Sequence, residues 1–269
     1  MQNPIPFPEL YDVLKTLVDG IHRELGQKLT GAYLQGSFAL GGYDEHSDAD
    51  FIVVIRGELS ADEVERLQNL HQAVFRLPHS WAQHLEGSYF PEGQLRDLTQ
   101  SGKPLWYLDN GSNCLCRSGH CNTLLVRWIL REKGLTLCGP APDTFIPRVP
   151  TADLRREMLD VLSNWGNEIL SDPGQYNNRF YQGFIVLSYC RMLHDYLNGF
   201  PGSKTSGAAW ASQNLDPVWT GLIKRSWATR PQPELRIREK ADPEDFAATL
   251  SFVRYVMREA GQYLSDPKA

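Results

Sequence analysis

The hydrophobic pattern of the chain changes at a proline-rich segment between residues 139 and 150. Four of these twelve residues are prolines, which typically interrupt helices and strands. Before the segment, helical patterns alternate with short apolar runs, whereas only helical patterns follow it. We therefore expect an α+β fold with two domains. Residues 1–140 would contain a mixed β-sheet and helices, residues 141–150 a linker, and residues 151–269 an all-α helical bundle.

Two predicted strands flank a polar loop in the first half. Residues 31–35 are expected to form the first strand, and the β-branched run at 49–55 the second. A helix is predicted at 9–25, where apolar residues recur every three or four positions. Ser60 and Glu63 have the spacing of a capping box and predict another helix up to residue 74. Further strands are expected at 81–90 and 135–138.

The second half has no strand pattern that competes with its helical periodicity. Helices are predicted at 152–170, 178–197, 215–227 and 243–264. Asp242 is expected to cap the last helix, with Pro243 at its first position.

Composition excludes several classes of protein. The chain has 27 Lys and Arg residues against 32 Asp and Glu, and a net charge of −5 argues against a large basic DNA-binding surface. The longest apolar runs, such as residues 51–55, are far shorter than the roughly 20 residues of a membrane-spanning helix. The first eight residues have no basic segment typical of a signal peptide, so a cytoplasmic location is expected.

The cysteines do not have the arrangement of a disulfide framework. There are five, an odd number, and they are unevenly placed. Cys114, Cys116 and Cys121, with His120, raise the question of zinc. Their spacing matches paired zinc knuckles poorly, so free thiols are the favoured interpretation.

The loop between the first two predicted strands contains the residues that best indicate chemistry. Gly36 and Ser37 are followed eleven positions later by Asp48, and Asp50 comes two residues after that. Because side chains alternate along a strand, the two carboxylates would lie on one face. Carboxylate oxygens suit Mg²⁺, and a Gly-Ser turn can present N–H groups and a hydroxyl to phosphates. The alternative is that these residues only cap turns, but their joint occurrence favours a phosphate and metal site.

The segment 36–50 resembles the signature of the polymerase-β-like nucleotidyltransferase superfamily, in which G-S is followed by D-x-D leading into a strand. The longer pattern G-S-x-A-x-G-G-x-x-x-x-S-D-x-D is similar to the aminoglycoside adenylyltransferases that modify streptomycin and spectinomycin. Residues 134–140 are similar to the passage that closes that family's catalytic domain. The resemblance implies a catalytic first domain and a helical second domain.

The resemblance also implies a mechanism and a set of site residues. ATP would be the co-substrate, and AMP would be joined to a hydroxyl with release of pyrophosphate. Asp48 and Asp50 would hold Mg²⁺, and Glu86 matches the family's catalytic glutamate on the next central strand. Arg191 and Lys204 match family residues that approach the nucleotide. Gly36 and Ser37 would also bind the nucleotide. The location of Arg191 and Lys204 implies a cleft between the two domains, where ligands preferentially bind.

The sequence departs from the family at positions that contact the drug. Ten residues before Arg191, streptomycin-modifying enzymes carry an acidic residue, whereas this chain has Tyr181. A tryptophan used for drug binding falls near Asn110. Tyr181 and Trp106 are alternative candidates for lining a substrate pocket, although aromatic residues at such positions also pack in cores.

Three functions are therefore considered. The first is adenylylation of a small, aminoglycoside-like acceptor, cationic acceptors included. The second is transfer of AMP to a protein side chain, as in nucleotidyltransferase antitoxins. The third is a non-catalytic, nucleotide-binding regulatory protein, which would have no need of three converging carboxylates. The sequence does not predict the acceptor's identity or the oligomeric state.

Overall fold

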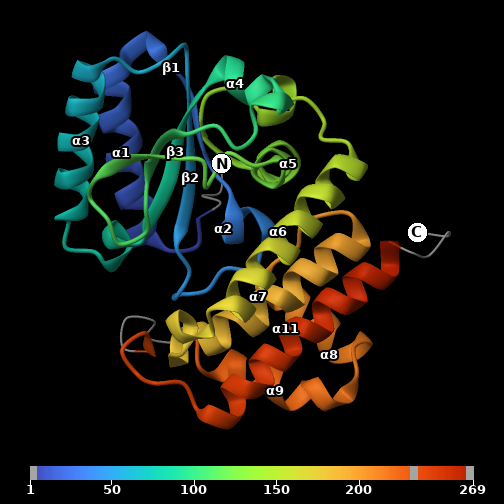
Figure 1. The fold of residues 1–269 in the computed structure, drawn as a ribbon. Helices are drawn as coiled ribbons and strands as arrows, with labels where there is room; N and C mark the ends of the chain where they lie inside the picture. The colour runs from blue at the N-terminus through green and yellow to red at the C-terminus, as the bar shows by residue number, and fades with distance from the viewer. Residues whose placement is uncertain (1–4, 231–235, 265–269) are drawn as a thin grey trace. The chain divides into compact units, whose positions relative to one another are not determined.

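The computed structural model describes residues 5–230 and 236–264, and the chain divides into two compact units (Figure 1). The first unit comprises Met1–Val149 and the second Pro150–Ala269. No helix in the described ranges is long and apolar enough to cross a membrane.

The first unit is built on a six-stranded sheet with the order β5-β4-β3-β2-β1-β6. The strands are β1 (Leu29–Leu34), β2 (Ala49–Ile55), β3 (Leu85–Pro91), β4 (Leu105–Leu108), β5 (Leu115–Ser118) and β6 (Leu135–Cys138). The neighbours β2 and β3 are parallel, and the other neighbouring strands are antiparallel. The mixed sheet expected from the sequence is confirmed.

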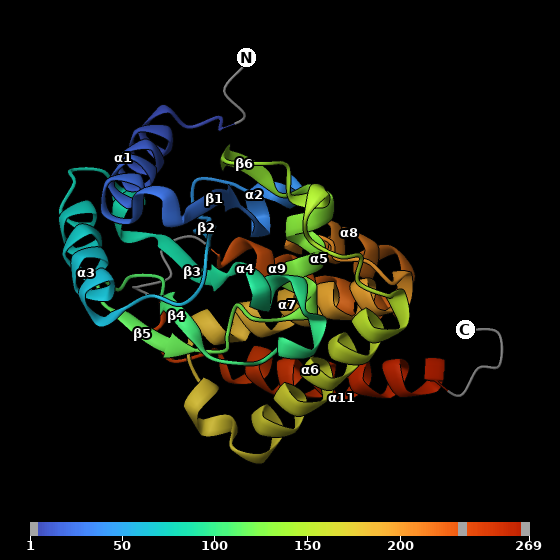
Figure 2. The same ribbon diagram turned by 90° about the horizontal axis from the view of Figure 1, so that it is seen from above.

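Helices cover both faces of this sheet (Figures 1 and 2). On one face, α1 (Pro8–Leu25) and α3 (Ala61–Phe75) pack against Phe51, Val53 and Ile55 of β2. On the other face, α5 (Leu124–Lys133) packs against Ile52 and Val54. The short helices α2 (Gly36–Leu40) and α4 (Glu92–Arg96) each follow a strand directly. Strand β2 is therefore buried on both sides, which explains its continuous apolar sequence.

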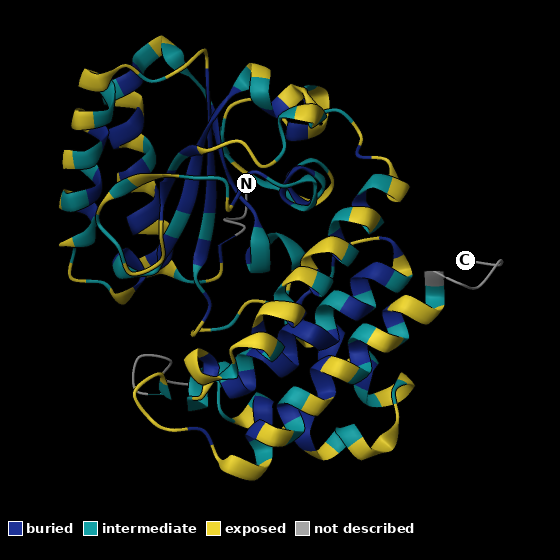
Figure 3. Ribbon diagram, viewed as in Figure 1, coloured by how far each residue is buried: buried dark blue, intermediate teal, exposed yellow. Residues whose placement is uncertain are grey.

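The second unit is a helical bundle, as expected. It contains α6 (Thr151–Ser171), α7 (Arg179–Asn198), α8 (Lys204–Asn214), α9 (Thr220–Ala228) and α11 (Pro243–Leu264). Figure 3 shows that burial in this unit is concentrated on α7. Asp242 caps α11, since its Oδ1 accepts hydrogen bonds from the N–H groups of Glu244 and Asp245.

The sequence expectation did not include α2, α4, α5, β4 or β5, and three further elements differ from it. The predicted strand at 81–90 begins only at Leu85, because Ser80–Gln83 form a 3₁₀ helix that buries Trp81. The predicted helix at 215–227 starts at Thr220 after a 3₁₀ turn over Pro217–Trp219, which Asp216 caps. Helix α8 was not predicted, because its small residues form no apolar stripe.

Much of the proline-rich segment packs on the first unit. Pro142–Thr144 form a 3₁₀ helix, and Ile146 is buried in the same cluster as Tyr33 and Ile52. The Arg131 guanidinium donates to the carbonyls of Asp143 and Ile146, which ties the segment to α5.

Candidate active site

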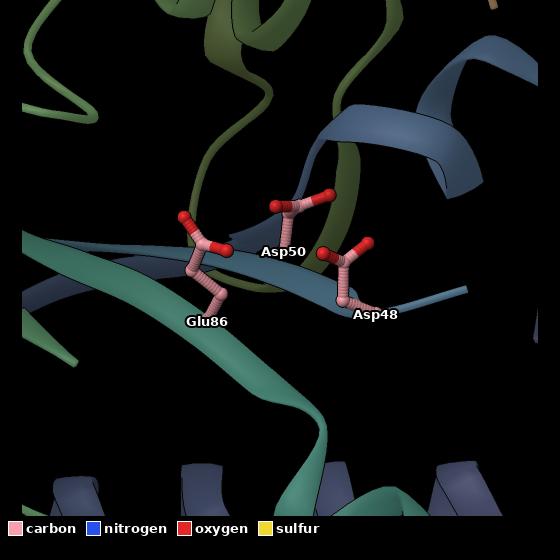
Figure 4. A group of neighbouring side chains, drawn as sticks. All are labelled: Asp48, Asp50 and Glu86. Atoms are coloured by element: carbon pink, nitrogen blue, oxygen red, sulfur yellow. The ribbon is translucent and has the colours of Figure 1, made fainter. Parts of the chain in front are cut away.

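Three carboxylates converge at the start of the parallel strand pair (Figure 4). In the register of β2 and β3, Asp50 lies directly beside Glu86, so the two side chains share one face of the sheet. Asp48 precedes β2 by one residue. One oxygen of each of the three lies within 4.8 Å of the others. These three residues were expected to act together, and the structure brings them together.

The loop before β2 is held by its own side chains. Ser47 Oγ accepts a hydrogen bond from the Asp44 N–H at 2.9 Å, and Asp44 Oδ1 accepts one from the His46 N–H at 3.0 Å. The Tyr43 ring stacks on Phe38 of α2 with 4.8 Å between centroids. Because both ends of the loop are fixed, Asp48 is presented beside the sheet in a defined position.

Gly36 lies against Asp50, and Ser37 follows it in α2. Gly36 has a positive φ of 60°, and a Cβ built on it would lie 1.9 Å from Asp50 Oδ2. The backbone can approach Asp50 this closely only because the residue is glycine. Ser37 Oγ is buried and has no hydrogen-bond partner within the described residues. A buried hydroxyl in this state has unused capacity to bond a ligand oxygen.

Glu86 is largely buried. Its side chain is 13% exposed, and burial raises the pKa of its carboxyl above the ordinary value. The hydrogen bond from Tyr107 lowers this pKa, and the negative charge of Asp48 raises it. A glutamate with a raised pKa is suited to accept a proton near neutral pH.

Several neighbours of Glu86 were not identified from the sequence. The Tyr107 hydroxyl lies 2.8 Å from Glu86 Oε1, and it also lies 2.8 Å from Asp109 Oδ1. His120 Nε2 is 3.5 Å from Glu86 Oε1, and Cys121 Sγ is 3.8 Å from it. The polar residues at alternate positions 107 and 109 indicate a polar face of a strand. Without the pairing of that strand with β3, the sequence does not connect this face to Glu86.

The cysteine group considered for zinc is not a single cluster. Cys114 and Cys116 are exposed thiols, whereas Cys121 is buried beside Glu86. Burial raises the pKa of the Cys121 thiol. Within the described residues, the one group of three or more acidic, histidine or cysteine side chains close enough to share a metal ion is that of Asp48, Asp50 and Glu86.

Trp106 was expected as a candidate for the substrate pocket, but it lies on the other face of the sheet. Tyr107 faces Glu86, and side chains alternate along β4, so Trp106 points the opposite way. It packs against the core beneath α1 and α3, and the Arg117 guanidinium lies 5.5 Å from its ring centroid. Trp106 is therefore not beside the carboxylates.

The candidates in the second unit lie along α7 and at the start of α8. Tyr181, Phe184 and Arg191 are separated by three and seven positions, so they share one face of α7. Lys204 Nζ lies 4.6 Å from the Phe184 ring centroid. A Cβ on Gly207 would come within 2.5 Å of Arg191 Cα, so α8 packs directly on the backbone of α7 at this point.

The loop that leads to Lys204 is fixed by a buried carboxylate. Asp195 Oδ1 accepts a hydrogen bond from the Gly202 N–H at 2.8 Å and contacts His194 Nδ1 at 2.8 Å. Burial raises the pKa of Asp195, and the positive charge of Arg191 lowers it. Asp195 thus connects the end of α7 to the residues that precede α8.

Family models match both units of the chain. Residues 15–79 match the nucleotidyltransferase domain, and residues 144–259 match the C-terminal domain of aminoglycoside adenylyltransferase. The first unit therefore contains a nucleotidyltransferase domain, and the second is similar to the C-terminal domain of aminoglycoside adenylyltransferase. The family resemblance inferred from residues 36–50 is confirmed.

The fold of this nucleotidyltransferase is similar to that of spectinomycin adenyltransferase AAD(9) from Enterococcus faecialis, a crystal structure with ATP and spectinomycin. The TM-score is 0.68 with 14% sequence identity, and the similarity covers 93% of this chain and 99% of the other. Sequence comparison with characterised proteins gives no significant match. The structural similarity at this identity concerns the fold, so the acceptor has to be argued from the residues of this nucleotidyltransferase.

Proposed function

We propose that this nucleotidyltransferase is a Mg²⁺-dependent adenylyltransferase that transfers AMP from ATP to a hydroxyl of a small, aminoglycoside-like molecule and releases pyrophosphate. The convergence of Asp48, Asp50 and Glu86 within 4.8 Å is the observation that carries the proposal. A nucleotide-binding protein without catalysis has no need of three such groups, whose mutual repulsion opposes folding.

Asp48 and Asp50 would hold the metal ion. They offer hard oxygen ligands on adjoining positions of one face, which fits Mg²⁺. Bound there, Mg²⁺ would offset the negative charge of the phosphates and polarise the α-phosphate for attack. The close approach of Gly36 to Asp50 and the unpartnered hydroxyl of Ser37 support placing the phosphates beside these ligands.

Glu86 would accept the proton of the attacking hydroxyl. Burial raises its pKa, so it would be a stronger base than an exposed glutamate once it is ionised. The oxygen of the acceptor would then form a bond to the α-phosphorus while the bond to pyrophosphate breaks. Replacement of Glu86 by Gln would leave the ATP site intact and remove the proton acceptor.

Arg191 and Lys204 would contribute positive charge toward the triphosphate. Both are half-buried, and both are placed by the packing of α8 on α7. Arg191 presents a planar set of N–H donors, and Lys204 a compact ammonium group; both suit phosphate oxygens.

Tyr181 would contact the acceptor from a half-buried aromatic group. Its ring lies 5.1 Å from Tyr176, 5.2 Å from Phe180 and 6.3 Å from Phe184. Aromatic faces attract cations less strongly than a carboxylate does, so this surface favours an acceptor with less positive charge than streptomycin.

The proposal is tested by incubating the protein with α-³²P-labelled ATP, Mg²⁺ and either streptomycin, spectinomycin or a wider aminoglycoside panel. We expect label on a small molecule together with release of pyrophosphate, and loss of both in Asp50→Ala. Label on a polypeptide would instead support protein adenylylation. A protein that does not bind ATP, or that releases pyrophosphate with none of the acceptors, would contradict an enzymatic function. A thermal-shift screen with Mg-ATP would identify acceptors, since ligands of the folded state raise its stability.

A further inference from the structure

The carboxylate of Glu86 is held by one of its two oxygens. Within the described part of the chain, its hydrogen-bond and ion-pair contacts all fall on Oε1, from Tyr107, His120 and Cys121. The Tyr107 contact, at 2.8 Å, is the only one of these three within ordinary hydrogen-bond distance. Oε2 is therefore the oxygen that remains to meet an acceptor hydroxyl.

The Tyr107 hydroxyl has a second acidic neighbour. In the antiparallel register, Ser88 pairs with Tyr107 and Gly87 with Leu108. Continuing this register one residue beyond β4 places Asp109 opposite Glu86. Two carboxylates directly opposite each other repel. The Tyr107 hydroxyl oxygen lies 2.8 Å from one oxygen of each. A phenol has a single hydrogen, so it can donate to only one of them at a time.

We propose that Tyr107 and Asp109 are positioning residues that fix Glu86 for proton abstraction. The inference rests on the proposed function, because it takes Glu86 as the base. A glutamate side chain has three rotatable bonds, and a hydrogen bond to Oε1 limits them, so that Oε2 keeps one direction. Misplacement of a reacting group by about 1 Å can cost a hundredfold in rate.

Asp109 completes this arrangement after the proton has moved. The acceptor O–H bond breaks as its oxygen joins the α-phosphorus, pyrophosphate leaves, and the proton binds Glu86 Oε2. Glu86 is then neutral, and the carboxylate of Asp109 becomes the stronger acceptor for the Tyr107 hydrogen. The Tyr107 hydrogen turns to Asp109 by rotation about the Cζ–O bond, and no proton leaves Tyr107. Asp109 is exposed to solvent.

The experiment compares Tyr107→Phe, Asp109→Asn and a matched control, Tyr33→Phe. The control removes a hydroxyl from the same sheet that donates to the Pro140 carbonyl at 2.8 Å. Rates are measured as pyrophosphate release with spectinomycin and, independently of the acceptor, with water. We expect kcat to fall about 10- to 100-fold in Tyr107→Phe and a few-fold in Asp109→Asn, with the KM for ATP unchanged. Tyr33→Phe should keep the wild-type kcat.

A double-mutant cycle with Glu86→Asp separates positioning from a general structural effect. The shorter carboxylate is drawn back from Tyr107, so Tyr107→Phe should change kcat less than about twofold in that background. Additive losses, or a fall in thermal midpoint that parallels the loss of rate, would overturn the inference. So would an unchanged kcat in Tyr107→Phe. A wild-type protein that releases no pyrophosphate would overturn the proposed function itself, which is a different outcome from an active wild type with an equally active Tyr107→Phe.

Discussion

Gly36 lies so close to Asp50 that an added Cβ would come within 1.9 Å of Asp50 Oδ2. Gly36→Ala should therefore displace the Asp50 carboxylate, which we propose holds the metal ion, and strain a backbone with a φ of 60°. We expect ATP-dependent transfer to fall at least about a hundredfold, with the strain alone costing about 1–2 kcal/mol of stability.

Gly57→Ala is the matched control for this prediction. Gly57 has a φ of 68°, but a Cβ there would meet nothing within 4 Å. It should lose similar stability in urea unfolding while keeping activity. If both variants kept activity, the contact between Gly36 and Asp50 would have no catalytic importance.

Asp50→Asn should separate stability from activity. The substitution relieves repulsion among three nearby carboxylates, so the metal-free protein should gain about 0.5–2 kcal/mol of stability while losing transfer. Mg²⁺ should stabilise the wild type more than the variant in thermal unfolding. Asp160→Asn, at an exposed position of α6, removes the same charge and should change neither property. An equal Mg²⁺ response in wild type and Asp50→Asn would argue against the metal site.

The raised pKa of Glu86 predicts a pH dependence of stability. Burial is its main cause, so the folded state holds this proton more tightly than the unfolded state does. Between the ordinary pKa of 4.5 and the raised one, stability is lost as pH increases. Glu86→Gln does not lose stability in this way. The difference between its free energy of unfolding and that of the wild type should therefore grow from acid toward neutral pH and then level off.

Urea unfolding in EDTA at a series of pH values measures this difference. Glu65→Gln, at an exposed position of α3, serves as the comparison and should show no such growth. A constant difference between Glu86→Gln and the wild type would show that the pKa of Glu86 is not shifted by folding.

Lys204→Met should weaken ATP binding without disturbing the helix packing. Methionine can keep the contact over the Phe184 ring but lacks the charge. We expect affinity for ATP to fall about tenfold, or roughly 1.4 kcal/mol, close to the value of one charge-assisted hydrogen bond. Calorimetry with Mg-ATP measures the change, and Lys224→Met on the exposed side of α9 should bind normally. Unchanged affinity in Lys204→Met would place this side chain outside the nucleotide site.

The fold and the central carboxylates follow from local sequence signals. Asp48 and Asp50 are two positions apart at the start of β2, so the local sequence alone predicts that they lie on one face. Ser60 forms the expected capping box. The apolar run after Asp50 indicates a strand buried on both faces, and β2 is such a strand. Glu86 was identified through family resemblance, and its place beside Asp50 depends on the register of β2 and β3.

The missed features depend on contacts between distant residues. Strand β4 has only four residues, and its pairing with β3 is what brings Tyr107 and Asp109 to Glu86. Trp106 was misplaced for the same reason, since one position along the strand changes the face of the sheet. Helix α8 lacks an apolar stripe because its glycine and alanines serve close approach to α7.

The burial of α7 limits the positions at which this helix can be substituted without disrupting the core. Most of its residues between Gln182 and Tyr196 are packed against neighbouring helices, so substitutions there would disrupt the core of the second unit. The half-buried positions of Tyr181, Phe184 and Arg191 do not carry that constraint to the same degree. Under the proposed function, acceptor specificity would change by substitution at these few positions of α7, because the rest of the helix is fixed by packing in the core.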